Sequence, residues 1–94
     1  MKMTIGELAA VEIIKLVGID NMPPTAGLQV GINGGGCSGF EYTCRIAFGP
    51  GKDDHVFTQN GANVFVDRKS AIFLDGTIVD YKTGLMDAGF KFYN

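Results

Sequence analysis

A cysteine at the centre of a glycine-rich run is the residue of this sequence best suited to chemistry. Residues 34–40 read Gly-Gly-Gly-Cys-Ser-Gly-Phe, which places the cysteine at position 37. Consecutive glycines lose much backbone entropy on folding and add no side chain to pack, so they usually serve a backbone that adopts positive φ or approaches another group closely. The sulfur of Cys37 then has little side-chain cover, which suits a thiolate that meets a metal, a cluster or a substrate. The alternative is a glycine-rich hairpin in which Cys37 is only a small residue.

The second cysteine, Cys44, belongs to an alternating run over residues 40–48, where it shares one face with Tyr42 and Ile46. On an inward face a free cysteine behaves as a small hydrophobic residue. The sequence therefore favours a structural role for Cys44 and argues against a metal-binding one. We expect Cys37 to be the accessible thiol and Cys44 the protected thiol.

Residues 35–39 also fit G-x-C-x-G, a cysteine form of the nucleophile elbow, which would indicate a cysteine-dependent hydrolase. Such a nucleophile needs a base, and His55 is the only histidine of the chain. The elbow also needs a turn from a strand into a helix, whereas the alternation over residues 40–48 predicts a strand. His55 is better explained as an exposed loop residue that follows two aspartates, so the hydrolase is kept only as a remote alternative.

The residues that precede the glycine-rich run predict an amphipathic helix. Thr4-Ile5-Gly6-Glu7 has the form of a capping box, which predicts a helix that begins after Thr4. Gly18 is the expected end of this helix. Between these limits, apolar residues recur at helical spacing and predict a broad apolar face. They are Leu8, Ala9, Val11, Ile13, Ile14 and Leu16.

Short alternating runs predict strands on both sides of the glycine-rich run. The expected strands are residues 28–33, 40–48, 56–58, 63–67, 77–81 and 90–93. Asn60-Gly61 is a strong hairpin signal between two of them, and Asp67 should cap a short helix that ends at Gly76. One amphipathic helix, a series of mostly antiparallel strands and a second short helix make the fold class α+β, in a single domain over residues 1–94.

The composition excludes several classes of protein. The 94 residues carry a net charge of −2, with 8 basic and 10 acidic side chains and no basic patch, so nucleic acid is not an expected partner. No apolar run approaches the roughly 18 residues that a membrane span needs, so no membrane partner is expected. Two cysteines do not form a disulfide framework in a chain of this size. A reducing compartment, most simply the cytoplasm, is the expected location.

Several motifs occur here in the order found in one protein family. Over nearly its whole length the chain resembles the A-type iron–sulfur carriers, also called the HesB-like domain. The combination of motifs is far more specific than any one of them. The motifs are GGGCSGF at 34–40, Asn60-Gly61 before VFVD at 64–67, Lys69-Ser70, LDGT at 74–77, Asp80-Tyr81, Gly84-Leu85-Met86 and AGFKF at 88–92.

The resemblance implies both a fold and a function. Members of that family have a compact pair of mixed sheets with helices, form homodimers or tetramers, and are not enzymes. They bind iron or an iron–sulfur cluster, here expected to be [2Fe–2S], and pass it to apo-proteins. The partners so implied are a cluster scaffold or cysteine desulfurase system and apo iron–sulfur proteins. The loop cysteine of the family carries over to Cys37, which makes Cys37 the expected ligand of the iron or cluster.

The family's other two ligand cysteines form a Cys-x-Cys pair just after the AGFKF strand. This sequence contains no Cys-x-Cys and stops at Tyr93-Asn94. A shortened sequence, an interrupted reading frame and natural loss of the segment are three explanations that stay open. Two Cys37 thiolates from a two-fold dimer would supply half of the four ligands of a [2Fe–2S] centre, so a bound cluster should be labile. The alternative is a degenerate family member that acts as a protein-interaction module without a cluster.

Overall fold

Two small sheets and two helices make up the part of the chain that the computed structural model describes, residues 1–33, 41–84, 86 and 88–93. The strands and helices follow one another along the chain in an order that mixes both types, as the sequence predicted. They are β1 (Met3–Ile5), α1 (Glu7–Ile19), β2 (Gly27–Asn33), β3 (Glu41–Ala47), β4 (His55–Gln59), β5 (Ala62–Val66), α2 (Arg68–Leu74), β6 (Thr77–Lys82) and β7 (Gly89–Tyr93).

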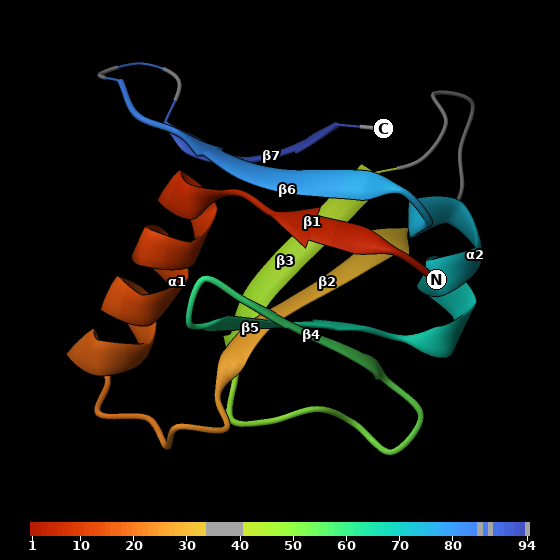
Figure 1. Ribbon diagram of the computed structural model, residues 1–94, viewed down its shortest axis with the longest axis horizontal. Helices are drawn as coiled ribbons and strands as arrows, with labels where there is room; N and C mark the ends of the chain where they lie inside the picture. Colours follow the sequence, from red (N-terminus) through yellow and green to blue (C-terminus); the bar gives the residue numbers. More distant parts are fainter. Residues whose placement is uncertain (34–40, 85, 87, 94) are drawn as a thin grey trace.

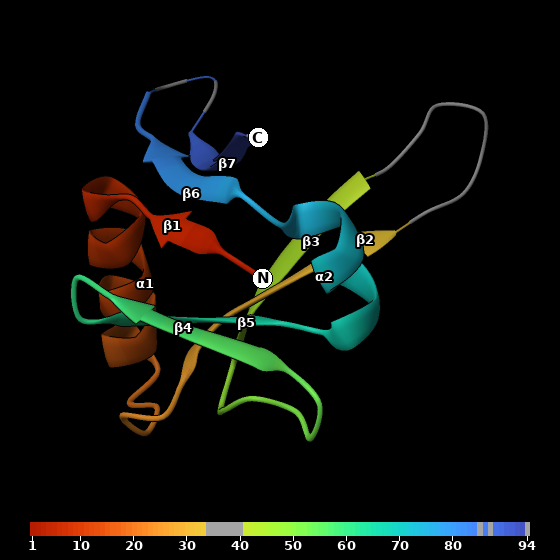
Figure 2. The ribbon, with the colours of Figure 1, turned by 45° about the vertical axis from the view of Figure 1, so that its right-hand side comes forward.

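The strands form a three-stranded sheet in the order β1-β6-β7 and a four-stranded sheet in the order β3-β2-β5-β4. The pairs β1–β6 and β2–β5 are parallel, and the other neighbouring strands are antiparallel. Figures 1 and 2 show the smaller sheet lying across the larger one, with α1 along one flank and α2 at the opposite end. The expected α+β class with a pair of mixed sheets is confirmed.

The core lies between the two sheets and is filled by apolar side chains from both sheets and both helices. Removing these side chains from water is the main favourable term in folding. The central strand β2 contributes Leu28 and Val30, both of which are almost completely buried. The other large members of this cluster are Met3, Ile5, Ile13, Val64, Val66, Leu74 and Val79.

The N-terminal segment differs from the prediction because Thr4 belongs to a strand and does not cap a helix. Met3 and Ile5 are buried on either side of the exposed Thr4, and β1 runs parallel to β6. The chain then turns at Gly6, whose N–H donates to the carbonyl of Val79 at 2.8 Å, and α1 begins at Glu7 without a side-chain cap. The expected capping box is therefore wrong, since pairing with β6 fixes Thr4 in an extended conformation.

The free edge of β1 is covered by one amide side chain from the other sheet. The Gln59 side chain accepts a hydrogen bond from the Ile5 N–H at 2.7 Å and donates one to the Met3 carbonyl at 2.8 Å. Gln59 thus acts as the next strand would, because it satisfies a donor and an acceptor of the β1 backbone. This contact joins β4 to the smaller sheet.

Helix α1 extends through Gly18 to Ile19, beyond the end that the sequence predicted. Its buried side is formed by Ala9, Ala10 and Ile13. The expected broad apolar face is only partly buried, because Leu8, Val11 and Ile14 remain exposed. In the described segments, neither helix has the combined length and hydropathy that crossing a membrane requires.

One hairpin turn and one helix cap that the sequence predicted are confirmed. Asn60 and Gly61 both have positive φ, of 52° and 80°, as a two-residue hairpin turn requires. Asp67 caps α2, since its side chain accepts a hydrogen bond from the Ser70 N–H at 3.0 Å.

Candidate functional site

Cys37 and the rest of the run 34–40 lie outside the described residues, but the two strands that lead into and out of the run are described. β2 ends at Asn33 and β3 begins at Glu41, and these two residues are antiparallel partners. The run therefore connects two paired strands. That arrangement differs from the strand-to-helix turn of a nucleophile elbow, and His55 lies on β4, beyond both β2 and β5 in the sheet.

The end of β2 is held by a side chain of α2. The parallel pairing of β2 with β5 stops at Val30 and Val66, because β5 ends there and the chain turns into α2. Two residues further along β2, the Ile32 N–H donates to the Ser70 hydroxyl at 3.0 Å. Ser70 is buried, so its oxygen continues the hydrogen bonding of β2 at a level where β5 no longer can.

The position of Ser70 is in turn stabilised by Asp67, whose carboxylate accepts a hydrogen bond from the Ser70 N–H. Partial burial alone would raise the pKa of the Asp67 carboxyl, but hydrogen bonds from the side chain and backbone of Ser70, with others from nearby backbone, outweigh that effect and lower the pKa. The carboxylate is therefore favoured, and it orients the first turn of α2. Sequence reasoning found the cap but missed Ser70, whose only signal was a small polar residue three positions after the capping aspartate.

Four elements meet at the level where β2 and β3 approach the run 34–40. Ile32 pairs with Tyr42 of β3, and the Tyr42 ring stacks on Phe92 of β7 with centroids 5.0 Å apart. Together with the Ser70 contact, this row runs from α2 through β2 and β3 to β7. The C-terminal strand is thereby anchored at the base of the segment that carries Cys37.

Cys44 is exposed, which corrects the expectation that its thiol is protected. The predicted parity is right, because Cys44 pairs with the buried Val30 and points to the same face. However, β3 is the edge strand of its sheet, and this stretch of its inner face is left open. Neighbouring groups still desolvate the sulfur partly and raise the pKa of the Cys44 thiol.

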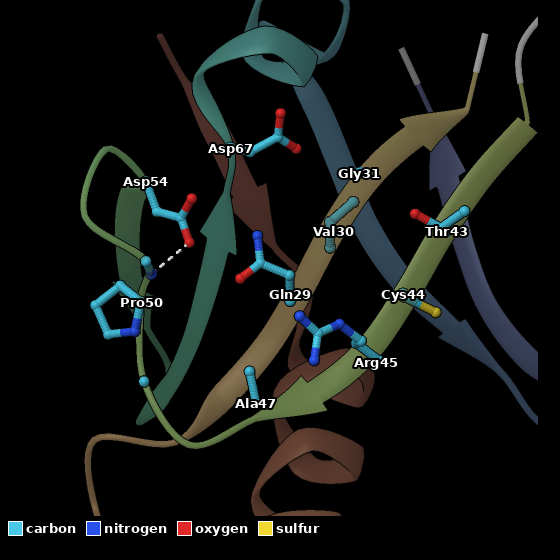
Figure 3. A pocket seen from close by; sticks show the side chains of 12 residues that line it. Gln29, Val30, Gly31, Thr43, Cys44, Arg45, Ala47, Pro50, Asp54 and Asp67 are labelled. Carbon is cyan, nitrogen blue, oxygen red and sulfur yellow. Dashed lines mark hydrogen bonds between the residues drawn. The ribbon is translucent and has the colours of Figure 1, made fainter.

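A hollow of about 520 Å³ lies against the larger sheet and is lined mainly by residues of β2 and β3, Cys44 among them. Figure 3 shows Gln29, Arg45 and Asp67 on this side, whereas the Cys44 sulfur lies on the other side of β3 from the Arg45 guanidinium. Asp54, at the rim, accepts a hydrogen bond from the Gly51 N–H at 2.7 Å. Within the described ranges, no three His, Cys, Asp or Glu side chains are grouped to hold a metal ion. Cys37, the thiol that the sequence predicts to bind metal, lies outside these ranges, so that assignment stays a prediction.

Comparison with known proteins gives a consistent result. The model of the family described as iron-sulphur cluster biosynthesis matches residues 1–94. The chain is 43% identical over 79 residues to protein HesB of Leptolyngbya boryana, which covers 84% of this chain and 65% of that protein. It is 37% identical over 94 residues to the iron-binding protein IscA of Xenorhabdus nematophila, which covers all of this chain and 86% of that one.

The solved structure of Escherichia coli SufA, a protein involved in the biosynthesis of iron–sulfur clusters, superposes with a TM-score of 0.84. It is 35% identical, and the match covers 98% of this chain and 79% of SufA. The chain spans only 55–65% of the HesB proteins that it matches.

Proposed function

Since this chain belongs to the iron-sulphur cluster biosynthesis family, we propose that it binds iron or a [2Fe–2S] cluster through Cys37 and passes it to apo-proteins. The iron or cluster is cargo in this proposal, so the protein acts as a carrier and not as a catalyst. The observation that carries the proposal is the family match over residues 1–94, which includes the glycine-rich run with Cys37.

The surroundings of the run support a ligand role for Cys37. The run leaves and re-enters one sheet between two paired residues, Asn33 and Glu41. Ser70 holds the β2 side of this base and the Tyr42–Phe92 stack holds the β3 side. Both strand ends next to the segment with Cys37 are therefore held by contacts with other elements. Such supporting contacts help to position a ligand side chain.

Cys44 is the weaker candidate although it is exposed. A thiol with a raised pKa has less of the thiolate that binds iron. One Cys37 per chain leaves a [2Fe–2S] cluster short of its usual four ligands. A homodimer or tetramer that brings two copies of Cys37 together would supply two, and small thiols or a client's cysteines would supply the others. We therefore propose that the cluster is labile and is exchanged readily.

The partners proposed are those of the pathway that the family serves. A cluster scaffold or a cysteine desulfurase system delivers the cargo, and apo iron–sulfur proteins receive it. The cytoplasm is the proposed compartment, since the two cysteines are free to act as ligands only where thiols stay reduced. No nucleic acid or membrane is required for this role.

Anaerobic reconstitution with ferrous iron, sulfide and a small thiol tests the proposal. The parent protein should develop the visible absorbance of an iron–sulfur cluster, and mixing it with an apo-ferredoxin should transfer that absorbance. Cys37→Ser should lose the absorbance, whereas Cys44→Ser, the matched control, should keep it. If Cys37→Ser holds as much iron and sulfide as the parent, Cys37 is not the ligand and the carrier proposal fails.

A further inference from the structure

The hollow against the larger sheet contains a glycine that the backbone itself does not require. Gly31 lines the hollow from within β2, whose pairing with β3 continues without a bulge from Gly27 to Asn33. Its φ is not positive, so any residue could adopt this backbone conformation. A glycine inside a regular strand weakens the strand, and one reason for its presence is the close approach of a ligand.

The space left open at Gly31 is bordered by oxygen atoms. A β-carbon at this position would lie 3.2 Å from the Thr43 Oγ1, 3.4 Å from the Asp67 Oδ1 and 3.6 Å from the Ser70 Oγ. Ser70 is buried, and its N–H donates to the other oxygen of the Asp67 carboxylate. The carboxylate is therefore held in place before any ligand arrives. Acceptors gathered in this way suit an ammonium group, which carries three N–H donors.

A cationic side chain lies next to this space on the neighbouring strand. Arg45 follows Thr43 by two residues, so both side chains leave β3 on the same face. The Arg45 side chain is exposed, and within the described ranges its guanidinium has neither an ion pair nor a hydrogen bond. Figure 3 shows it extending from β3 toward Gln29. An unpaired guanidinium matches a carboxylate, which it can hold by two parallel hydrogen bonds.

The far wall of the hollow carries a second carboxylate. Asp54 is half-buried, and Figure 3 shows it with Pro50 on the loop between β3 and β4, across the hollow from Thr43. The lining thus holds two carboxylates, of Asp54 and Asp67, and one guanidinium, so it disfavours a ligand with a net negative charge. The volume of about 520 Å³ lies within the roughly 300–1,000 Å³ typical of small-molecule sites.

We propose that this hollow binds a free α-amino acid with a neutral or basic side chain. The ammonium of the ligand lies against the oxygens of Asp67 and Thr43, and its carboxylate lies on the Arg45 guanidinium. Two residues of a strand span about 7 Å, which an amino-acid headgroup bridges with a hydrogen bond of about 2.9 Å at each end. Asp54 excludes acidic side chains. The site uses no residue of the run 34–40, so it is separate from the proposed carrier role, and its openness to solvent makes the binding weak.

Titration of the metal-free, ¹⁵N-labelled protein with L-alanine, followed by NMR at constant ionic strength, tests the proposal. The amide signals of Gly31 and Thr43 should shift and saturate in the millimolar range. Propionate, which lacks the ammonium, and ethylamine, which lacks the carboxylate, should each bind at least about tenfold more weakly. L-lysine should bind at least as tightly as L-alanine, and L-glutamate more weakly. The absence of a saturable shift with L-alanine, or equal binding of ethylamine, propionate or L-glutamate, overturns the proposal.

Two variants locate the binding. Arg45→Gln removes the guanidinium at an exposed position, and Gly31→Ala fills the space beside Thr43 and Asp67. Each should weaken the binding of L-alanine by at least about tenfold. Arg68→Gln is the matched control, because Arg68 is an exposed arginine that does not line the hollow, and it should leave binding unchanged.

Thermal unfolding shows whether each variant keeps its fold, and Arg45→Gln decides the matter if Gly31→Ala does not fold. An Arg45→Gln protein that binds L-alanine as tightly as the parent overturns the proposal. All these measurements use metal-free protein, so their failure leaves the carrier proposal standing, and the reverse also holds.

Discussion

Tyr42 and Phe92 stack with their ring centroids 5.0 Å apart and their planes inclined by 14°, which joins the edge strand of one sheet to the edge strand of the other. Tyr42 lies at the start of β3 and pairs with Ile32 near the end of β2. The contact therefore links the C-terminal strand to the base of the segment that carries Cys37. Substitutions in this row of residues should therefore affect both the stability of the fold and the proposed site at Cys37.

The stack should contribute to stability beyond the area that its two rings bury. Phe92→Ala should lower the free energy of unfolding by about 2 kcal/mol, which is less than the roughly 3–5 kcal/mol of a fully buried ring because Phe92 is half-buried. In a double-mutant cycle with Tyr42→Ala, the coupling should be about 0.5–1.5 kcal/mol. Urea denaturation measures both quantities. Tyr93→Ala, an exposed ring on the same strand, is the control, and additive effects of the two variants would contradict the stack.

Ser70 should hold the end of β2 independently of any metal. Ser70→Ala removes the acceptor of the Ile32 N–H, so hydrogen exchange at that amide should accelerate. Exchange at the amide of Val30, which lies within the paired part of β2, should change much less and serves as the internal reference. Loss of a buried acceptor should also lower the free energy of unfolding by about 1–3 kcal/mol. Unchanged exchange at Ile32 would show that the hydroxyl does not hold the strand.

Asp67 makes the stability of the protein depend on pH in the acid range. Its pKa is lower in the folded state than in the unfolded chain, so the unfolded state binds the proton more readily. This contribution is fully present above the unfolded value of about 3.9 and is lost as the pH falls through the lower folded value. Asp67→Asn should therefore flatten the decline of stability below about pH 4. Thermal unfolding between pH 2 and pH 7 measures it, and parallel curves for the two proteins would contradict the assignment.

Local chemistry explains which parts of the fold could be predicted. Asn60-Gly61 specifies its own turn, and Asp67 caps α2 through a residue only three positions away. Strand β1 could not be found in this way, because it has only three residues. It pairs with β6, which begins at Thr77 and is distant in the sequence. Pairing with β6 overrode the capping signal of Thr4.

The alternation that placed Cys44 on an inner face was also correct, yet it could not show that this part of the face lies uncovered at a sheet edge. Which side of α1 is buried was equally hidden, since Leu8 and Ala9 both fit helical spacing. Ser70 was missed for the same reason, because its role depends on where β5 ends. Predictions failed where the environment comes from distant segments.

A substitution at Thr77 should stabilise the fold, whereas those at Phe92 and Ser70 should destabilise it. Its side chain is fully buried, and among the described residues its hydroxyl has no hydrogen-bond partner. Burying a hydroxyl without a partner is unfavourable. Thr77→Val should therefore raise the free energy of unfolding, by about 1 kcal/mol. Thr4→Val, at an exposed position of the neighbouring strand β1, is the control and should change little. A lower thermal midpoint for Thr77→Val would show that the hydroxyl has a stabilising role.

The last prediction joins the fold to the proposed cargo. Because Phe92 is stacked on Tyr42, a segment that follows Asn94 starts close to the strands that lead into the run with Cys37. Cysteines in such a segment should reach the same cluster at high effective concentration. Adding a flexible tail with Cys-x-Cys after Asn94 should therefore slow the loss of a reconstituted cluster to a chelator, followed by visible absorbance. A tail of equal length with Ser-x-Ser is the control for bulk and shielding. Phe92→Ala should reduce the gain, because it loosens the strand from which the tail departs. If the Cys-x-Cys and Ser-x-Ser tails protect the cluster equally, the C-terminal strand does not deliver ligands to the Cys37 segment.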